Sequence, residues 1–230
     1  MKKKNVLVIA AHPDDEILGC GATMAMHSSR GDEVNTLLFS RGIISRNNSK
    51  NIKKKLLSLK NAAIKANKIV GSKKIVLEDF PDNEFDSLPI INFAKIIERE
   101  LKLLNPDIIY THHNSDLNID HDIINRATMI ACRPIPESKI NMILTFEVNS
   151  STEWSNKNSN GNFNPNYFVK IDYKNFIKKT KALICYKDEM RKWPHPRSIK
   201  GLKVLAERRG SIAGLELAEA FSVFRIIKGK

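Results

Sequence analysis

The sequence has 230 residues, of which 42% are hydrophobic, so one domain spanning residues 1–230 can bury a sizeable core. Its formal net charge of +13 comes from lysines dispersed along the chain, and only 7% of the residues are aromatic. Surfaces that bind nucleic acid usually cluster their basic residues and interleave them with aromatic ones, so we expect no nucleic-acid partner. No apolar run reaches the roughly 18 residues of a membrane span, which argues against insertion into a membrane.

The three cysteines, Cys20, Cys132 and Cys185, are few and widely spaced. An odd number without clustering fits a reducing compartment and argues against a disulfide framework. We therefore expect a cytoplasmic protein.

Short apolar runs rich in β-branched residues alternate with helical patterns along most of the chain. The pattern predicts strands over 5–11, 33–40, 73–80, 107–113 and 141–148, and helices over 16–30, 49–70, 88–105 and 121–133. A polar, Asn-rich loop at 151–166 precedes a less regular part, with a strand near 168–174 and helices near 174–189 and 198–213. This alternation predicts an α/β fold: a three-layer, doubly wound, mostly parallel Rossmann-like sheet with helices on both faces and an irregular C-terminal part.

Two stretches rich in histidine and aspartate follow predicted strands, at the sheet edge where open parallel sheets bind their ligands. AHPDDE (11–16) follows the first strand, and THHNSDLNIDHD (111–122) follows the fourth. The residues that these stretches offer are His12, Asp14, Asp15, His112, His113, Asp116, Asp120 and His121.

Three adjacent carboxylates in HPDDE repel one another unless a cation lies among them or all three face water. Catalytic zinc takes three His or carboxylate ligands and keeps a position for water, so His12, Asp15 and one histidine of the second stretch would make a complete set. A further acid beside the activated water can accept its proton. Glu16 would then begin the helix, where the macrodipole favours an acid. Plain capping of the helix by the same acids is the alternative interpretation.

Other residues near predicted strand ends are candidates for substrate contacts. Arg41 and Arg46 follow the second strand and could bind hydroxyl or phosphate groups of a substrate, or simply be solvated. An aromatic side chain in the Asn-rich loop could cover an apolar face of the substrate. The remaining candidates are Glu147, Trp154, His195 and Arg197.

With AHPDDE after the first strand and DLNIDH after the fourth, the chain resembles the LmbE-like (PIG-L) zinc-dependent N-deacetylases. ACRP (131–134), FEVNSSTEW (146–154), NYFVKID (166–172) and the tail AERRGSIAGLELAEAF extend the resemblance over nearly the whole chain. It implies removal of the acetyl group from an N-acetyl amino sugar, often GlcNAc that carries a larger aglycone.

The resemblance implies a role for each matching residue. His12, Asp15 and His121 match the zinc ligands, and Asp14 matches the general base that takes a proton from the attacking water. Asp120 matches the acid that precedes the last ligand and is expected to be a second-shell residue of the metal site.

The sequence departs from the family at one position. Many relatives have a histidine where this chain has Asn118, and the resemblance implies that this histidine stabilises the oxyanion or donates a proton. Asparagine can donate a hydrogen bond but supplies no proton at neutral pH. Contact with the oxyanion could therefore fall to His113 or His195. Protonation of the leaving amine could fall to Asp14 after it has taken the proton of the water.

The resulting hypothesis is a zinc hydrolase acting on a small amino-sugar substrate, which a nucleotide or a lipid could carry. The same ligand set could also hold Fe²⁺ or Co²⁺. The alternatives are a zinc amidase acting on another amide, such as a thiol conjugate, and a non-enzymatic sugar- or nucleic-acid-binding protein. We also expect a homo-oligomer, because the HPR loop around His195 could complete a neighbour's site.

Overall fold

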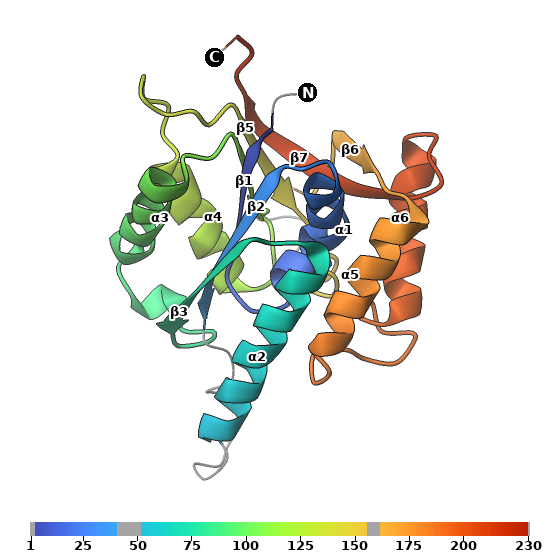
Figure 1. Cartoon of the computed structure of the whole chain (residues 1–230). Helices are drawn as coiled ribbons and strands as arrows, with labels where there is room; N and C mark the ends of the chain where they lie inside the picture. Colours follow the sequence, from blue (N-terminus) through green and yellow to red (C-terminus); the bar gives the residue numbers. More distant parts are fainter. Residues whose placement is uncertain (1–2, 41–51, 156–161, 230) are drawn as a thin grey trace.

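The computed structural model describes residues 3–40, 52–155 and 162–229, so the predicted substrate residues Arg41 and Arg46 lie outside it. Within these described residues, seven strands form one sheet in the order β3-β2-β1-β4-β5-β7-β6 (Figure 1). The strands are β1 (Asn5–Ala10), β2 (Glu33–Ser40), β3 (Lys74–Phe80), β4 (Ile108–His112), β5 (Met142–Phe146), β6 (Tyr167–Lys170) and β7 (Ala218–Ile226). The helices are α1 (Asp15–Ser29), α2 (Ile52–Val70), α3 (Ile90–Leu104), α4 (Ile119–Ala131), α5 (Tyr173–Cys185) and α6 (Ile199–Ile212), with a short 3-10 helix at Phe85–Ser87.

The first five strands are parallel, and the central ones are buried on both faces because helices cover each side. Along β1, Val6 and Val8 point into the core under α1, α2 and α5, whereas Leu7 and Ile9 point into the core under α3 and α4. This alternation confirms the predicted three-layer, mostly parallel architecture. No described helix has the length and apolar character needed to cross a bilayer.

The C-terminal strand β7 is the main element that the sequence analysis did not predict. It lies antiparallel between β5 and β6, so the sheet ends in two antiparallel pairings. Its first residues, Ala218 to Ala220, include Glu219, and this composition favours a helix over a strand. Burial between two neighbouring strands and α1 outweighs that local preference.

Helix α1 contains a break at Cys20, where φ is −144° and ψ is 22°. The break frees backbone groups inside a buried helix, and two charged side chains bind them. Lys179 Nζ donates to the Leu18 carbonyl at 2.7 Å, and the Glu219 carboxylate accepts from the amides of Ala22 (3.1 Å) and Thr23 (2.7 Å). Lys179 and Glu219 also pair directly at 2.6 Å. The α1 backbone is therefore completed by residues of α5 and β7.

Gly19 allows α1 to approach the sheet closely. A Cβ atom at this position would lie 2.2 Å from Cδ2 of Phe146 on β5. Only glycine fits there without displacing the ring, so this residue fixes the depth at which the start of α1 packs.

Candidate active site

The HPDDE segment links the end of β1 to the first turn of α1, at the sheet edge where the parallel strands end. Asp15 is the first helical residue, and its Oδ2 accepts from the amide of His12 at 3.0 Å. Asp14 has a positive φ of 113°, which is uncommon for a residue with a side chain. Its amide donates to Glu16 Oε2 at 3.0 Å. The turn is thus fixed by its own acidic side chains.

Three donor atoms from the two predicted stretches converge beside this turn. His12 Nδ1 lies 3.0 Å from Asp15 Oδ2 and 3.2 Å from His121 Nε2, and the last two atoms are 3.1 Å apart. Ligands about 2.0–2.1 Å from a tetrahedral zinc ion are separated by roughly 3.3 Å, so the triangle has nearly the size that such an ion needs. Asp15 Oδ1 is buried and has no hydrogen-bond partner among the described residues, which leaves it free to face a cation. The donor set therefore fits a divalent metal.

Each histidine of this triangle has a carboxylate beside its other ring nitrogen. Asp120 Oδ2 lies 3.0 Å from His12 Nε2, and Asp116 Oδ1 lies 3.0 Å from His121 Nδ1. Such carboxylates orient metal-binding imidazoles and increase their basicity. Burial opposes protonation of His121, yet Asp15 and Asp116 outweigh it and raise its pKa to about 9. The cluster thus attracts positive charge.

Asp120 also fixes a loop across the site. Its two carboxylate oxygens accept from the amides of Asn83 (2.8 Å) and Phe85 (3.1 Å). Asp120 therefore joins the segment after β3 to His12.

Asp14 is buried beside the donor triangle and pairs with Arg197. Arg197 Nη1 lies 2.9 Å from Asp14 Oδ2, and Arg197 Nε donates to the Asn149 carbonyl (3.2 Å) and Ser150 Oγ (3.0 Å). Burial raises the pKa of Asp14 well above its usual value, and the charge of Arg197 opposes that rise. Asp14 makes no side-chain capping hydrogen bond to α1. Its carboxylate therefore faces the site instead of capping the helix.

Glu16, the third acid of HPDDE, is fully buried behind the site. Its Oε1 accepts from Tyr186 Oη at 2.7 Å and from Asn67 Nδ2 at 2.8 Å, while Oε2 holds the Asp14 amide. Burial outweighs these hydrogen bonds and raises the pKa of Glu16 to about 7. Glu16 thus connects the strained backbone of Asp14 to α2 and to the end of α5, a role that the sequence analysis did not foresee.

A cavity of about 400 Å³ opens onto these groups. Its wall includes the metal-binding triangle, Asp14 and Arg197, and it is completed by residues from four further segments. These are Lys55, Leu59, Asp82, Asn83, Asn118, Asp188 and Glu189. A volume of this size suits a small-molecule site.

The predicted residues differ in how they relate to this cavity. Asn118 lines it, but its side chain caps α4 by accepting from the Asp120 amide and donates to Asn83 Oδ1 at 3.0 Å. Trp154 is 55% exposed and lines an adjoining hollow that shares Asn83, Asn118 and Arg197 with the cavity. His195 packs edge-on against Trp154, with ring centroids 5.3 Å apart.

Two other predicted residues, His113 and Glu147, belong to a separate cluster around Phe163. His113 Nδ1 accepts from the amide and hydroxyl of Ser115, and its ring packs against Phe163. Glu147 pairs with Arg209 through two bonds of 2.8 and 2.6 Å, and the Arg209 guanidinium lies over Phe163. Neither His113 nor Glu147 is among the described residues that line the cavity.

Comparison with known proteins relates this arrangement to a family. Residues 7–132 match the model of the PIG-L family, which is described as GlcNAc-PI de-N-acetylase. The uncharacterized deacetylase YaiS of Escherichia coli is 28% identical over 191 residues, which cover 81% of this chain and 92% of YaiS. The probable N-acetyl-alpha-D-glucosaminyl L-malate deacetylase 2 of Bacillus cereus is 24% identical over 156 residues, 66% of this chain and 71% of the relative.

The fold recurs in the N,N'-diacetylchitobiose deacetylase of Pyrococcus horikoshii. That structure superposes with a TM-score of 0.76 at 20% identity and covers 96% of this chain and 84% of its own. At this identity the likeness shows a shared fold.

Proposed function

The chain belongs to the PIG-L family, and from this premise we propose that it is a zinc-dependent hydrolase that removes the acetyl group from an N-acetyl amino sugar of the GlcNAc type. Family membership makes the chain a hydrolytic N-deacetylase. The zinc ion, the sugar and the roles of individual residues are what the proposal adds. The observation that carries it is the convergence of His12 Nδ1, Asp15 Oδ2 and His121 Nε2 beside the Asp14 carboxylate in one cavity.

We assign the metal to His12, Asp15 and His121. When bound there, zinc supplies Lewis-acid chemistry, because it lowers the pKa of water to about 7 and polarises a carbonyl group. Two imidazoles and one carboxylate can also hold Fe²⁺ or Co²⁺, so the choice of zinc rests on the family resemblance and not on geometry.

Asp14 moves the protons in this scheme. Its carboxylate accepts a proton from the water that attacks the acetyl carbonyl, and it then returns that proton to the amine nitrogen as the C–N bond breaks. Acetate and the free amino sugar are the products. Arg197 and Glu16 hold Asp14 from its side chain and its backbone, respectively, so the carboxylate keeps one orientation through both transfers.

The oxyanion that forms during the attack needs a hydrogen-bond donor in the cavity wall. Asn118 and Arg197 both line the cavity, so we assign this contact to them in preference to His113 and His195. Trp154, in the adjoining hollow, offers an aromatic face for the apolar side of the sugar ring.

The direct test measures acetate release by the zinc-loaded chain, with bound metal quantified in the same preparation. The substrates are the methyl glycoside of GlcNAc, N,N'-diacetylchitobiose and nucleotide- and lipid-linked GlcNAc. We expect acetate from at least one of these, with activity lost on chelation and restored by zinc. Zinc bound without acetate from any of them would instead favour another amide as the substrate. No bound metal would contradict the proposal.

Zinc affinity should depend on the carboxylate behind His12. Asp120→Asn keeps one oxygen, which can accept from one of the two loop amides, but it removes the charge behind the His12 ring, so zinc should bind about 10–100-fold more weakly. Competition with a chromophoric chelator measures this affinity. Asp122→Asn, in the same helical turn, is the matched control and should bind zinc as the wild type does. Equal affinity in all three proteins would refute the assigned role of Asp120.

A further inference from the structure

Tyr186, the residue that follows α5, places a hydroxyl group in the interior behind the site. Its side chain is 2% exposed, and its hydroxyl donates to Glu16 Oε1 at 2.7 Å. Burial and the charge of Glu16 raise the pKa of Tyr186 well above its usual value, so the hydroxyl keeps the proton that it donates. Tyr186 is not among the described residues that line the catalytic cavity, so any effect of this hydroxyl on the reaction has to pass through Glu16.

Three hydrogen-bond donors surround the Glu16 carboxylate. Oε1 accepts from Tyr186 and from Asn67 Nδ2 at 2.8 Å, and Oε2 accepts from the Asp14 amide at 3.0 Å. Asn67 is itself fixed, because its Oδ1 accepts from Thr36 Oγ1 on β2 at 2.8 Å. Buried hydrogen bonds of this kind fix a side chain strongly, since water cannot replace them. Glu16 therefore has one orientation, set by α2 and by the end of α5.

The backbone of Asp14 depends on this orientation. Its φ of 113° and ψ of −31° lie outside the regions that residues with a side chain normally adopt. A residue stays in such a conformation only where its surroundings fix it. The Asp14 carbonyl accepts from the amides of Ile17 and Leu18, whereas the Asp14 amide donates to Glu16 Oε2. The direction in which the Asp14 side chain leaves the backbone is therefore set in part by Glu16.

The segment 186–198, between α5 and α6, fixes Asp14 from both of its ends. Tyr186, at its start, acts on the Asp14 amide through Glu16. Arg197, near its end, pairs with the Asp14 carboxylate at 2.9 Å. One connecting segment thus supports both the backbone and the side chain of the same acid.

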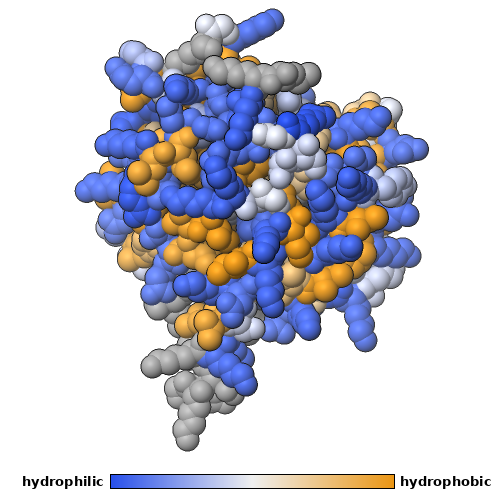
Figure 2. Space-filling model, viewed as in Figure 1, coloured by the Kyte–Doolittle hydropathy of each residue, from blue (hydrophilic) through white to orange (hydrophobic). Residues whose placement is uncertain are grey.

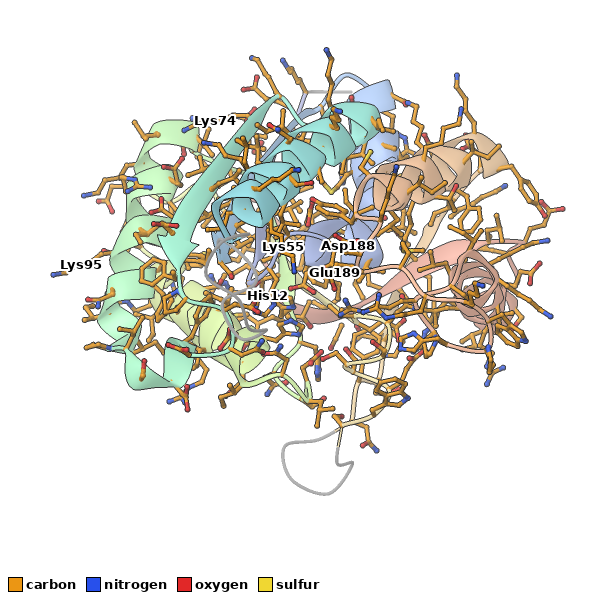
Figure 3. The ribbon with its side chains drawn as sticks, turned by 90° about the horizontal axis from the view of Figure 1, so that it is seen from below. His12, Lys55, Lys74, Lys95, Asp188 and Glu189 are labelled. Atoms are coloured by element: carbon orange, nitrogen blue, oxygen red, sulfur yellow. The ribbon has the colours of Figure 1, made fainter. Side chains whose placement is uncertain are left out.

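This segment also passes along the wall of the catalytic cavity. Asp188 and Glu189 line the wall, and Figure 3 shows both of them near His12. The Tyr186 ring lies in the hydrophobic core under α2 and α5. Figure 2 shows the outer side of these two helices, where hydrophobic side chains lie between hydrophilic ones. Phenylalanine at position 186 would keep the ring in the core and lose only the hydroxyl.

Resting on the proposed function, in which Asp14 is the general base, we propose that Tyr186 is a positioning residue whose hydroxyl orients Asp14 through Glu16. Without the hydroxyl, Glu16 Oε1 keeps only the bond from Asn67, so the carboxylate can rotate away from the Asp14 amide. Proton transfer needs the base within hydrogen-bond distance of the attacking water. A small displacement of Asp14 therefore slows the chemical step and leaves substrate binding unchanged.

The test compares Tyr186→Phe with Tyr110→Phe as the matched control. Tyr110 is also 2% exposed, and its hydroxyl lies 3.0 Å from Nε2 of His27, which is in the last turn of α1 and therefore far along the helix from Asp14. Both variants lose one buried hydroxyl group. Each protein is zinc-loaded, and kcat, KM, bound zinc and the midpoint of urea unfolding are measured.

We expect Tyr186→Phe to lower kcat for acetate release about tenfold, less than the roughly 100-fold cost of a full 1 Å displacement. Its KM and zinc content should equal those of the wild type. Tyr110→Phe should keep the wild-type kcat although its urea midpoint falls by a similar amount. Equal kcat values in the two variants would overturn the proposal.

A double variant tests whether Tyr186 acts through Asp14. Adding Tyr186→Phe to Asp14→Asn should lower kcat no further than Asp14→Asn alone, because the group that the hydroxyl orients is already lost. If the two effects multiply instead, Tyr186 acts by another route and the proposal is wrong.

Hydrogen exchange of the Asp14 amide, followed by NMR on the zinc-loaded protein, tests the link without any substrate. Exchange should be faster in Tyr186→Phe than in the wild type, whereas the Leu18 amide, which bonds to the Asp14 carbonyl, serves as the internal reference. Tyr110→Phe should leave the ratio of the two rates unchanged. An unchanged ratio in Tyr186→Phe would overturn the link. Absence of acetate from every N-acetyl sugar would overturn the proposed function, and the exchange ratio would still decide whether Tyr186 fixes Asp14.

Discussion

Replacing Asp14 with asparagine is expected to lower kcat for acetate release by a factor of about 10²–10⁴ while zinc remains bound. Asparagine has nearly the same shape and tolerates the positive φ of this position. The hydrogen bond from its amide to Glu16 is retained, and its side-chain oxygen can still accept from Arg197. What the variant loses is a group that accepts the proton of the attacking water.

The measurement combines initial rates with the zinc content of each preparation. Asp86→Asn, which changes an exposed acid in the short 3-10 helix after β3, is the control and should keep wild-type activity. An Asp14→Asn enzyme with full zinc and a nearly normal rate would show that another group takes the proton. Loss of zinc together with the rate would mean that Asp14 supports the metal instead.

Replacing Lys179 with methionine is expected to lower the free energy of unfolding by about 3–5 kcal/mol. Lys179 is buried, so the substitution leaves the Glu219 charge without its partner and the Leu18 carbonyl without its donor. Urea denaturation followed by circular dichroism measures the change. The double variant that adds Glu219→Gln should recover part of the loss, because the amide oxygen still accepts at α1 and no unpaired charge remains.

Lys178→Met is the comparison for this experiment, since the contact of Lys178 with Ser29 is exposed to solvent. Its effect should stay within about 0.5 kcal/mol. If Lys178→Met and Lys179→Met cost the same, the charges at the α1 break would not be the source of the stability.

The sheet and the meeting of the two polar stretches could be predicted from the sequence because each depends on a simple rule. Buried parallel strands are apolar throughout, and their carboxyl ends meet at one edge. His12 and His121 are 109 residues apart, yet His12 follows β1 and His121 lies in the first turn of α4, the helix that follows the neighbouring strand β4. The resemblance to the family additionally identified Asp14, among the acids of HPDDE, as the expected general base.

Side-chain contacts between the site and more distant helices could not be predicted from the sequence. Tyr186 and Asn67 reach Glu16 from α5 and α2, and no periodicity in the sequence records such a pairing. Adjacent residues on a helix point in directions about 100° apart, so Asp120 faces His12 and not its neighbour His121. Strand β7 was missed because Glu219, which is buried there, is atypical of a buried strand.

The contact between Glu219 and α1 also has a consequence for the order of assembly during translation. A nascent chain whose residue 219 is still inside the ribosome lacks the carboxylate that binds the amides of Ala22 and Thr23, and β5 is still an open edge. The turn that carries His12 and Asp15 precedes α1 directly, so the helix behind the site gains this support only after residue 219 has emerged.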